Sequence, residues 1–255
     1  MAVTIDRDGP ISILRLDRPE KLNAFDRAQY AALNRSIAEF EADAEARVGI
    51  ITSTHDRAFS VGVDLDDLSR AVSEERLDNE SLAAAFGLSI GRRGAVTKPL
   101  IAAVSGHCVG EGFGLALYCD MRVAASNAVF SLPEAKVGIT TLRATIRLPQ
   151  VIGLGNALEL LLAGVKKDAQ WALRVGLVNA VVPPEELMDT ALALARQIAE
   201  ASPRAVRNIR QLALESFSLP FDEAVEMGLE MRRQTPRADT AQGTKAFLEK
   251  KKPAF

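Results

Sequence analysis

The chain has 255 residues, of which 48% are hydrophobic and 25% charged, the ordinary balance of a folded globular protein. This composition excludes disorder over the whole length, and 31 basic against 33 acidic residues leave a net charge of −2. Proteins that bind nucleic acids usually carry a basic excess, so we expect no nucleic-acid partner.

Three further features of the sequence predict a cytoplasmic protein. No stretch approaches the roughly 18 apolar residues that a membrane span needs, so we expect no membrane partner. The first residues alternate like a strand and carry charge, unlike a signal peptide. The two cysteines, Cys108 and Cys119, have apolar neighbours, which is typical of buried free thiols in a reducing compartment.

The apolar pattern predicts alternating strands and helices in the first half of the chain. Period-two alternation around an Asp-Gly turn predicts a pair of strands over 2–16. Helical spacing of apolar residues predicts a helix over 26–44. Further along, we expect a strand over 48–53, helical structure over 66–96, a strand over 99–104, a helix over 111–119 and two short strands over 123–129. This order favours an α/β domain with a largely parallel sheet.

The second half is expected to be mainly helical. Helices are predicted over 148–165 and 169–175, followed by a short strand over 178–182. Prolines at 183–184, 203, 220 and 236 then begin four more helices, since proline is favoured in a first helical turn. We therefore divide the chain into an α/β core over 1–185 and a C-terminal helical region over 186–255.

Three loops near the ends of predicted strands have residues that suit a site. They read AFSVGVDL over 58–65, GHCVGEGFG over 106–114 and FSLPEAKVG over 130–138. Glycines let the backbone approach a ligand closely, and the helix start in the second loop offers N–H groups to a negative oxygen. The sequence matches neither a dinucleotide loop nor a phosphate loop nor a G-x-S-x-G hydrolase motif. An oxyanion hole of two backbone N–H groups fits these loops better.

These loops, with motifs along nearly the whole chain, resemble the crotonase (enoyl-CoA hydratase/isomerase) superfamily. The other matches are RPEKLNA over 18–24, Leu148-Pro149, Gly153, the segment 169–178 and FLEKKKP over 247–253. The resemblance implies an α/β fold with a ββα spiral as acyl-CoA-binding core and a C-terminal helical trimerisation region. It also implies an acyl-CoA substrate, no cofactor besides the CoA of that substrate, and a homotrimer or homohexamer.

The resemblance implies catalytic roles for three residues. The backbone N–H groups of Val63 and Glu111 match the pair that holds the thioester oxygen, and Glu134 matches an acid/base carboxylate. Hydratases of the family have a second glutamate where this chain has Gly114. With a single glutamate, isomerisation of a double bond is favoured over hydration, because a pair of carboxylates can hold and split a water. Hydration with help from another polar group, acyl-CoA hydrolysis, decarboxylation and mere acyl-CoA binding stay open.

Further positions match family residues that bind the substrate or its CoA, mostly through backbone atoms. They are Lys21, Leu22, Ala24, Ala58, Ser60, Val61, Gly62, Asp64, Leu65, Gly110, Phe247 and Lys250. Asp64 also fits the N-cap of a helix that begins at Leu65. The basic residues 250–252 are either a solvated chain end or attract the phosphates of CoA. No second His or Cys pair stands at metal-ligand spacing, so we expect no metal.

Two departures from the family pattern concern the acyl site. Glu111 stands where the family usually has glycine or alanine, and we expect its side chain to favour the helix N-terminus and point away. The alternative is that Glu111 replaces the missing second carboxylate. The loop 139–145 lacks the family's glycines and proline, and within it Arg143 is expected at the surface or paired along its helix. The alternative is that Arg143 holds a substrate carboxylate.

Overall fold

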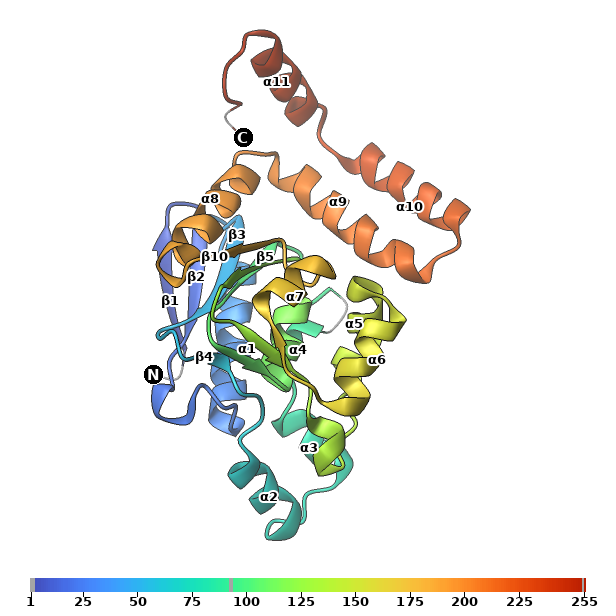
Figure 1. Ribbon diagram of the computed structural model, residues 1–255. Coiled ribbons are helices and arrows are strands. Elements are labelled where there is room, and N and C mark those ends of the chain that lie inside the picture. The colour runs from blue at the N-terminus through green and yellow to red at the C-terminus, as the bar shows by residue number, and fades with distance from the viewer. Residues whose placement is uncertain (1–2, 92–93, 254) are drawn as a thin grey trace.

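The computed structural model describes residues 3–91, 94–253 and 255, and two β-sheets form its centre (Figure 1). Within this range the larger sheet has six strands in the order β1-β2-β3-β5-β7-β10. β1 and β2 form an antiparallel hairpin, and the other neighbours are parallel. The bounds are β1 Val3–Asp8, β2 Ile11–Leu16, β3 Val48–Ser53, β5 Leu100–Val104, β7 Met121–Ala125 and β10 Ala180–Val182. The predicted strands of the core are confirmed.

A second, smaller sheet is missing from the sequence-based expectations. Its strands, as far as the structure describes the chain, are β4 Ala58–Ser60, β6 His107–Val109, β8 Val129–Ser131 and β9 Lys167–Asp168, in that order. The sequence predicted only loops over 58–60 and 107–109, because three residues are too few to show a period of two. β3 and β5 are each followed by a strand of this sheet and then by a helix. The chain therefore winds as a ββα spiral, and the predicted fold class is confirmed.

The main apolar core lies between one face of the larger sheet, the smaller sheet and two helices. Helix α1 (Arg27–Ala42) is N-capped by Asp26 and contributes Leu33 and Phe40 to this core. Helix α4 (Glu111–Tyr118) is buried along most of its length. Because successive strand residues point to opposite faces, Leu14 joins this core while Ile13 faces the other side.

The helical stretch predicted over 66–96 is divided in the structure. It consists of α2 (Leu65–Ser73), α3 (Asn79–Ala85) and the short η2 (Ser89–Gly91), while residues 92–93 lie outside the described residues. Asp78 accepts a hydrogen bond from the backbone N–H of Ser81 and so begins a new helix after the charged stretch. The helix predicted over 148–165 is likewise two helices, α5 (Leu142–Ile152) and α6 (Leu154–Ala163). They are separated at Gly153, whose φ of 78° favours glycine.

The helices after the core fall into two groups. After α7 (Ala169–Arg174), α8 (Leu187–Ala199) packs its alanines on the outer face of the larger sheet. Helices α9 (Pro203–Glu215), α10 (Phe221–Gln234) and α11 (Arg237–Leu248) extend away from the sheets (Figure 1). Large apolar side chains on this extension are exposed, including Ile209, Phe221, Phe247 and Leu248. The division of the chain at residue 185 stays a prediction. None of the helices among the described residues has the length and apolarity to cross a membrane.

Candidate active site

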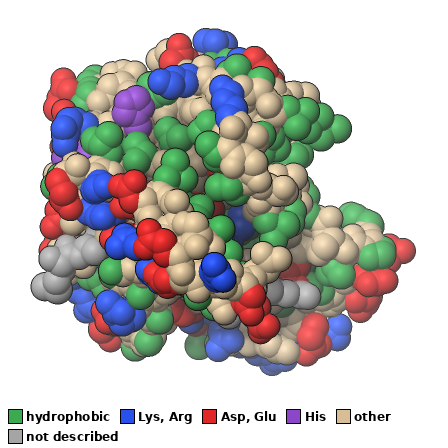
Figure 2. Space-filling model, turned by 90° about the horizontal axis from the view of Figure 1, so that it is seen from below, with side chains coloured by type: hydrophobic (Ala, Val, Ile, Leu, Met, Phe, Trp, Pro, Cys, Tyr) green, Lys and Arg blue, Asp and Glu red, His purple; other side chains and the backbone are tan. Residues whose placement is uncertain are grey.

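A cavity of about 650 Å³ lies where the loops after β4, β6 and β8 meet. Its walls also include residues of α1, α2, α3 and the start of α5. Most of the wall is apolar, with Leu65, Leu68, Leu82, Phe86, Ile139 and Leu142 among its residues. In Figure 2, which views the end of the molecule formed by α2 and α3, hydrophobic side chains gather near the middle of the face. An apolar cavity with a few convergent polar groups is typical of a small-molecule site.

Two backbone N–H groups meet at this cavity, as the sequence predicted. Val63 and Glu111 both line it, and a Cβ added at Gly62 would lie 3.1 Å from the backbone nitrogen of Glu111. Gly62 and Gly110 have φ of 90° and 57°, values that side chains disfavour. Across the described part of the chain, neither the Val63 nor the Glu111 N–H donates to a backbone carbonyl. Both are therefore available to an oxygen of a ligand, and the α4 dipole favours negative charge there.

The carboxyl group of Glu134 reaches the same loop from the other side. Glu134 begins the short helix η3 (Glu134–Val137), and a Cβ added at Gly110 would lie 3.5 Å from its Oε1. Its Oε2 is buried and has no hydrogen-bond partner among the described residues. Burial raises the pKa of Glu134, against the opposing hydrogen bonds from its own backbone and from Thr141. An unpartnered, buried carboxyl oxygen of raised pKa suits proton transfer to a bound ligand.

The expectation that the Glu111 side chain points away is wrong. Its side chain is 12% exposed, and the carboxyl group lies over Gly114, where an added Cβ would come within 3.1 Å of Oε2. Burial raises the pKa of Glu111 to about 7, although the Arg143 guanidinium opposes the shift. The Glu111 carboxyl group thus lies over Gly114, the position at which the resemblance implies a second glutamate in hydratases. The glycine at 114 leaves the space for it.

Arg143 is neither at the surface nor paired along its own helix, the two alternatives that the sequence predicted. Its guanidinium lines the cavity, with Nη1 2.7 Å from Oε1 of Glu111 and Nη2 donating to the carbonyl of Leu88 at 3.0 Å. Gly91 leaves room for the guanidinium, since a Cβ added there would lie 3.0 Å from Nε of Arg143. The ion pair joins the start of α4 to the start of α5. Local helix reasoning misses it, because the two residues are 32 positions apart.

Tyr30 is a cavity residue without a functional signal in the sequence. Helical spacing placed it on the apolar face of α1, and the structure buries it to 2% exposure. Tyr30 lines the cavity, and its buried hydroxyl has no hydrogen-bond partner among the described residues. Burial and the nearby carboxylates of Glu111 and Glu134 raise the pKa of Tyr30, so the phenol stays protonated. The hydroxyl is thus an unused donor inside the cavity.

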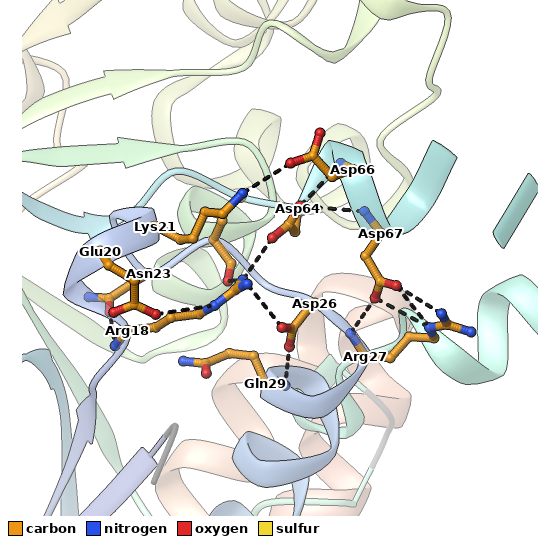
Figure 3. Close-up of polar contacts among 12 residues, drawn as sticks. Arg18, Glu20, Lys21, Asn23, Asp26, Arg27, Gln29, Asp64, Asp66 and Asp67 are labelled. Atoms are coloured by element: carbon orange, nitrogen blue, oxygen red, sulfur yellow. Dashed lines mark hydrogen bonds and ion pairs between the residues drawn. The ribbon is translucent and has the colours of Figure 1, made fainter. Parts of the chain in front are cut away.

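The predicted CoA-binding residues near Lys21 lie beside the cavity in a network of charges (Figure 3). Arg18 donates to Asp64 at 2.8 Å, Lys21 to Asp66 at 3.0 Å, and Arg27 to Asp67 at 2.8 Å. Asp64 caps α2 as expected. Burial alone would raise the pKa of Asp64, but Arg18 and the backbone N–H of Asp67 bring it below its usual value. These ion pairs link segment 18–27 to α2 and its N-cap.

The other predicted binding residues divide into four places. Val61, Leu65 and Gly110 line the cavity, with Gly62 adjacent. Ala24, Ala58 and Ser60 are buried behind it, where the Ser60 hydroxyl donates to the carbonyl of Asn23. Leu22 has a left-handed φ of 49° and ends the turn after Lys21. Phe247 and Lys250 belong to the C-terminal extension, far from α2 and α3 in a single chain (Figure 1). The structure does not bring these last two residues to the cavity.

Comparison with known proteins finds similar sequences and structures over nearly the whole chain. The family model for enoyl-CoA hydratase/isomerase matches residues 6–255. The chain is 34% identical to (E)-benzylidenesuccinyl-CoA hydratase of Thauera aromatica, over 100% of this chain and 99% of that protein. It is also 34% identical to carnitinyl-CoA dehydratase of Salmonella enteritidis, over 98% and 97%. The crystal structure of enoyl-CoA hydratase from Bacillus anthracis superposes with a TM-score of 0.89 at 29% identity, covering 100% of this chain and 99% of that one.

The chain belongs to the enoyl-CoA hydratase/isomerase family, because both the family model and relatives of more than 30% identity cover nearly its full length. Membership in the crotonase superfamily is thereby confirmed. Among residues 3–91, 94–253 and 255, no group of His, Cys, Asp and Glu side chains is arranged to hold a metal ion.

Proposed function

We propose that the protein adds water to the 2,3 double bond of an enoyl-CoA thioester, or removes water in the reverse direction. The observation that carries this proposal is that two carboxyl groups, of Glu134 and Glu111, reach one apolar cavity beside two free backbone N–H groups. A hydratase and a dehydratase among the relatives support the same class of reaction. No cofactor is needed beyond the CoA of the substrate.

The thioester oxygen would accept hydrogen bonds from the N–H groups of Val63 and Glu111. When water adds to C3, negative charge moves through C2 onto this oxygen, giving an enolate. Donors fixed in advance at that position lower the barrier, and removal of one such donor typically costs about 3 kcal/mol. The two loops fit this role because their glycines hold the donors close together.

The two carboxyl groups would divide the proton transfers between them. Glu134, as the carboxylate, takes a proton from the water while the water oxygen bonds to C3. Glu111, in its neutral form, then gives a proton to C2, and one proton passing between the two groups restores both. A pKa of about 7 leaves Glu111 protonated in a large share of molecules near neutral pH, which suits an acid.

A second candidate is the isomerisation of a 3-enoyl to a 2-enoyl thioester, with Glu134 alone moving the proton from C2 to C4. The contact that favours it is the ion pair between Arg143 and Glu111. This ion pair occupies one oxygen of Glu111, which is then not available to bind a water. In this reaction Glu111 would contribute its N–H only.

Product analysis in deuterated water separates the two reactions. The purified chain is incubated with matched 2-enoyl-CoA and 3-enoyl-CoA, and the products are read by mass spectrometry. We expect a water adduct from the 2-enoyl substrate, and a loss of about 10²–10⁴-fold in its formation in Glu111→Gln. Migration of the double bond without an adduct, unchanged in Glu111→Gln, would favour the isomerase. If the substrate binds and no product forms, both reactions are excluded, and acyl-CoA binding is the function that remains.

The proposal extends to a homotrimer or homohexamer in which the C-terminal extension of one subunit meets the body of another. The exposed apolar side chains of α9, α10 and α11 support it, because exposed apolar patches usually mark interfaces. Such contacts would give Phe247 and Lys250 a route to the CoA of a neighbouring subunit. Light scattering after size-exclusion chromatography gives the mass directly, and a monomer would contradict this part of the proposal.

A further inference from the structure

The cavity contains two hydrogen-bond donors that acyl-CoA hydration does not use. The Tyr30 hydroxyl is buried and has no partner among the described residues. Arg143 has five N–H donors, and the structure assigns one to Glu111 and one to the carbonyl of Leu88. Buried donors are nearly always satisfied in folded proteins, so unused ones in a cavity indicate a ligand that supplies acceptors.

The surroundings of Arg143 are shaped to hold its guanidinium at the wall of the cavity. Gly91 leaves room for it, because an added Cβ would lie 3.0 Å from Nε, while one at Gly87 would make ordinary contact with Nη2 at 3.8 Å. The carbonyl of Leu88 lies between these glycines and accepts from Nη2 at 3.0 Å. A carboxyl oxygen of Glu111 already sits at 2.7 Å from Nη1, so the place accepts a carboxylate. The planar guanidinium matches carboxylates in two-point geometry.

We propose that the acyl group of the substrate carries a carboxylate beyond its thioester. This carboxylate replaces Glu111 as the ion-pair partner of Arg143 and accepts a hydrogen bond from the Tyr30 hydroxyl. This inference rests on the proposed function, since it names the class of acyl group that the same site takes. The rest of the wall is apolar and suits the carbon chain between the two ends. A substrate carboxylate at Arg143 would also leave Glu111 without its counter-ion and hence protonated, the form that gives a proton to C2.

The charges of the cavity favour a carboxylate over other anions and over a neutral group. Its ionisable side chains are Arg143, Glu111, Glu134, Lys136 and the phenol of Tyr30. The ammonium of Lys136 donates to the carbonyl of Gly164, so Arg143 is the cation that faces Glu111. A single negative charge can replace that of Glu111 when this carboxyl takes up a proton. A phosphate would bring a second charge beside Glu134, and a neutral hydroxyl would not displace an ion pair.

Saturated acyl-CoA thioesters test binding apart from turnover. The pairs succinyl- and butyryl-CoA, glutaryl- and valeryl-CoA, and adipoyl- and hexanoyl-CoA have equal chain lengths and differ at the far end of the chain. Isothermal titration calorimetry on the full chain gives a Kd for each. In one pair or more, we expect the carboxylate member to bind at least about tenfold more tightly, the range of a charge-assisted hydrogen bond.

Variants assign this preference to residues. Arg143→Gln should abolish the preference and leave the affinity for the neutral member within about threefold. Tyr30→Phe should reduce the preference in part, while Tyr118→Phe, the matched change at a tyrosine outside the cavity lining, should keep it. Glu111→Gln removes the competing carboxylate and should tighten binding of the carboxylate member, a gain that a merely damaged fold would not give.

The outcomes separate the inference from the proposed function. If both members of every pair bind equally to the wild type, the inference is wrong while acyl-CoA binding stands. A preference that survives Arg143→Gln and is lost in Lys136→Gln would overturn the choice of Arg143. If no thioester of either kind binds, the proposed function fails first and the inference falls with it.

Discussion

The two charged regions near the cavity differ in what their charges can do. The network between segment 18–27 and α2 contains many ion pairs, but its outer members are exposed, such as Lys21 at 47% and Asp66 at 82% (Figure 3). Glu111 and Arg143 form one pair, with the Glu111 side chain 12% exposed. Asp64 and Asp67 of the network are as buried as Glu111, but hydrogen bonds from Arg18, Arg27 and backbone N–H groups lower their pKa. At Glu111, burial outweighs Arg143 and raises the pKa to about 7. Proton transfer near neutral pH is therefore expected at Glu111 rather than at Asp64 or Asp67.

The largest effect should separate a cavity carboxylate from a network carboxylate. Glu134→Gln removes the proposed base with little change in shape, and we expect kcat for hydration to fall about 10²–10⁴-fold with the Kd for a saturated acyl-CoA retained. Glu75→Gln, the same change at a residue that only pairs with Arg27, should alter kcat less than about twofold. Steady-state kinetics and calorimetry on both variants check this. Similar losses in the two would remove the distinction between the regions.

The change in folding stability with pH should have opposite signs for Glu111 in the cavity and for Asp67 in the network. The pKa of Glu111 is raised from 4.5 to about 7, so the unfolded chain ionises this group first as the pH rises. Its stabilising contribution is complete below pH 4.5 and is lost by about pH 7, amounting to about 3 kcal/mol. The pKa of Asp67 is lowered, first by its hydrogen bond from Arg27. Its contribution is present above its ordinary value of 3.8 and is lost as the pH falls through the lowered value.

Urea unfolding of the wild type and Glu111→Gln at pH 5 and pH 8 isolates the Glu111 contribution. The groups that face Glu111 are Arg143, Glu134, Tyr30 and Tyr118, and all four are unchanged in the variant. We expect the free energy of unfolding of the wild type, relative to the variant, to be lower at pH 8 than at pH 5. An equal difference at both values would mean that Glu111 does not titrate in this range.

A smaller loss is expected from moving Glu111 without removing it. Gly114→Ala places a Cβ 3.1 Å from Oε2, so the flexible carboxyl end must shift by a few tenths of an ångström. Because proton transfer is sensitive to position, kcat for hydration should fall roughly tenfold. Gly155→Ala is the matched control, since its Cβ would have nothing within 4 Å. Equal kcat in the two variants would argue that the position of the Glu111 carboxyl does not matter.

Local patterns in the sequence predicted most elements of the core but not the way the cavity is assembled. The turn at Gly9, the helix over 26–44 and the buried strand over 48–53 were predictable, because neighbouring residues determine them. The smaller sheet was not, since strands as short as Ala58–Ser60 have no readable period. The candidate residues Val63, Glu111 and Glu134 do line one cavity. Their predicted roles in catalysis stay a prediction.

The orientation of Glu111 could not be predicted for a physical reason. Its own helix favours a carboxylate turned toward the N-terminus, but Gly114 opens a space and Arg143 supplies a partner from a distant helix. Similarly, helical spacing identifies Tyr30 as a core residue and says nothing about its hydroxyl. Buried polar atoms depend on contacts between segments, which a single sequence does not display.

The smallest effect is expected at the exposed edge of the network and tests the predicted CoA site. Lys21 pairs with Asp66 at the surface, and its hydrogen bond to the Asp66 carboxylate raises the pKa of Lys21, so the ammonium stays charged. Exposed pairs contribute little to stability, and the family resemblance implies CoA contacts through the backbone here. Lys21→Ala should therefore leave the thermal midpoint nearly unchanged and weaken binding of a saturated acyl-CoA by less than about threefold. A tenfold loss that disappears at high salt would instead show that the ammonium binds a phosphate of CoA, and the network would then belong to the binding site.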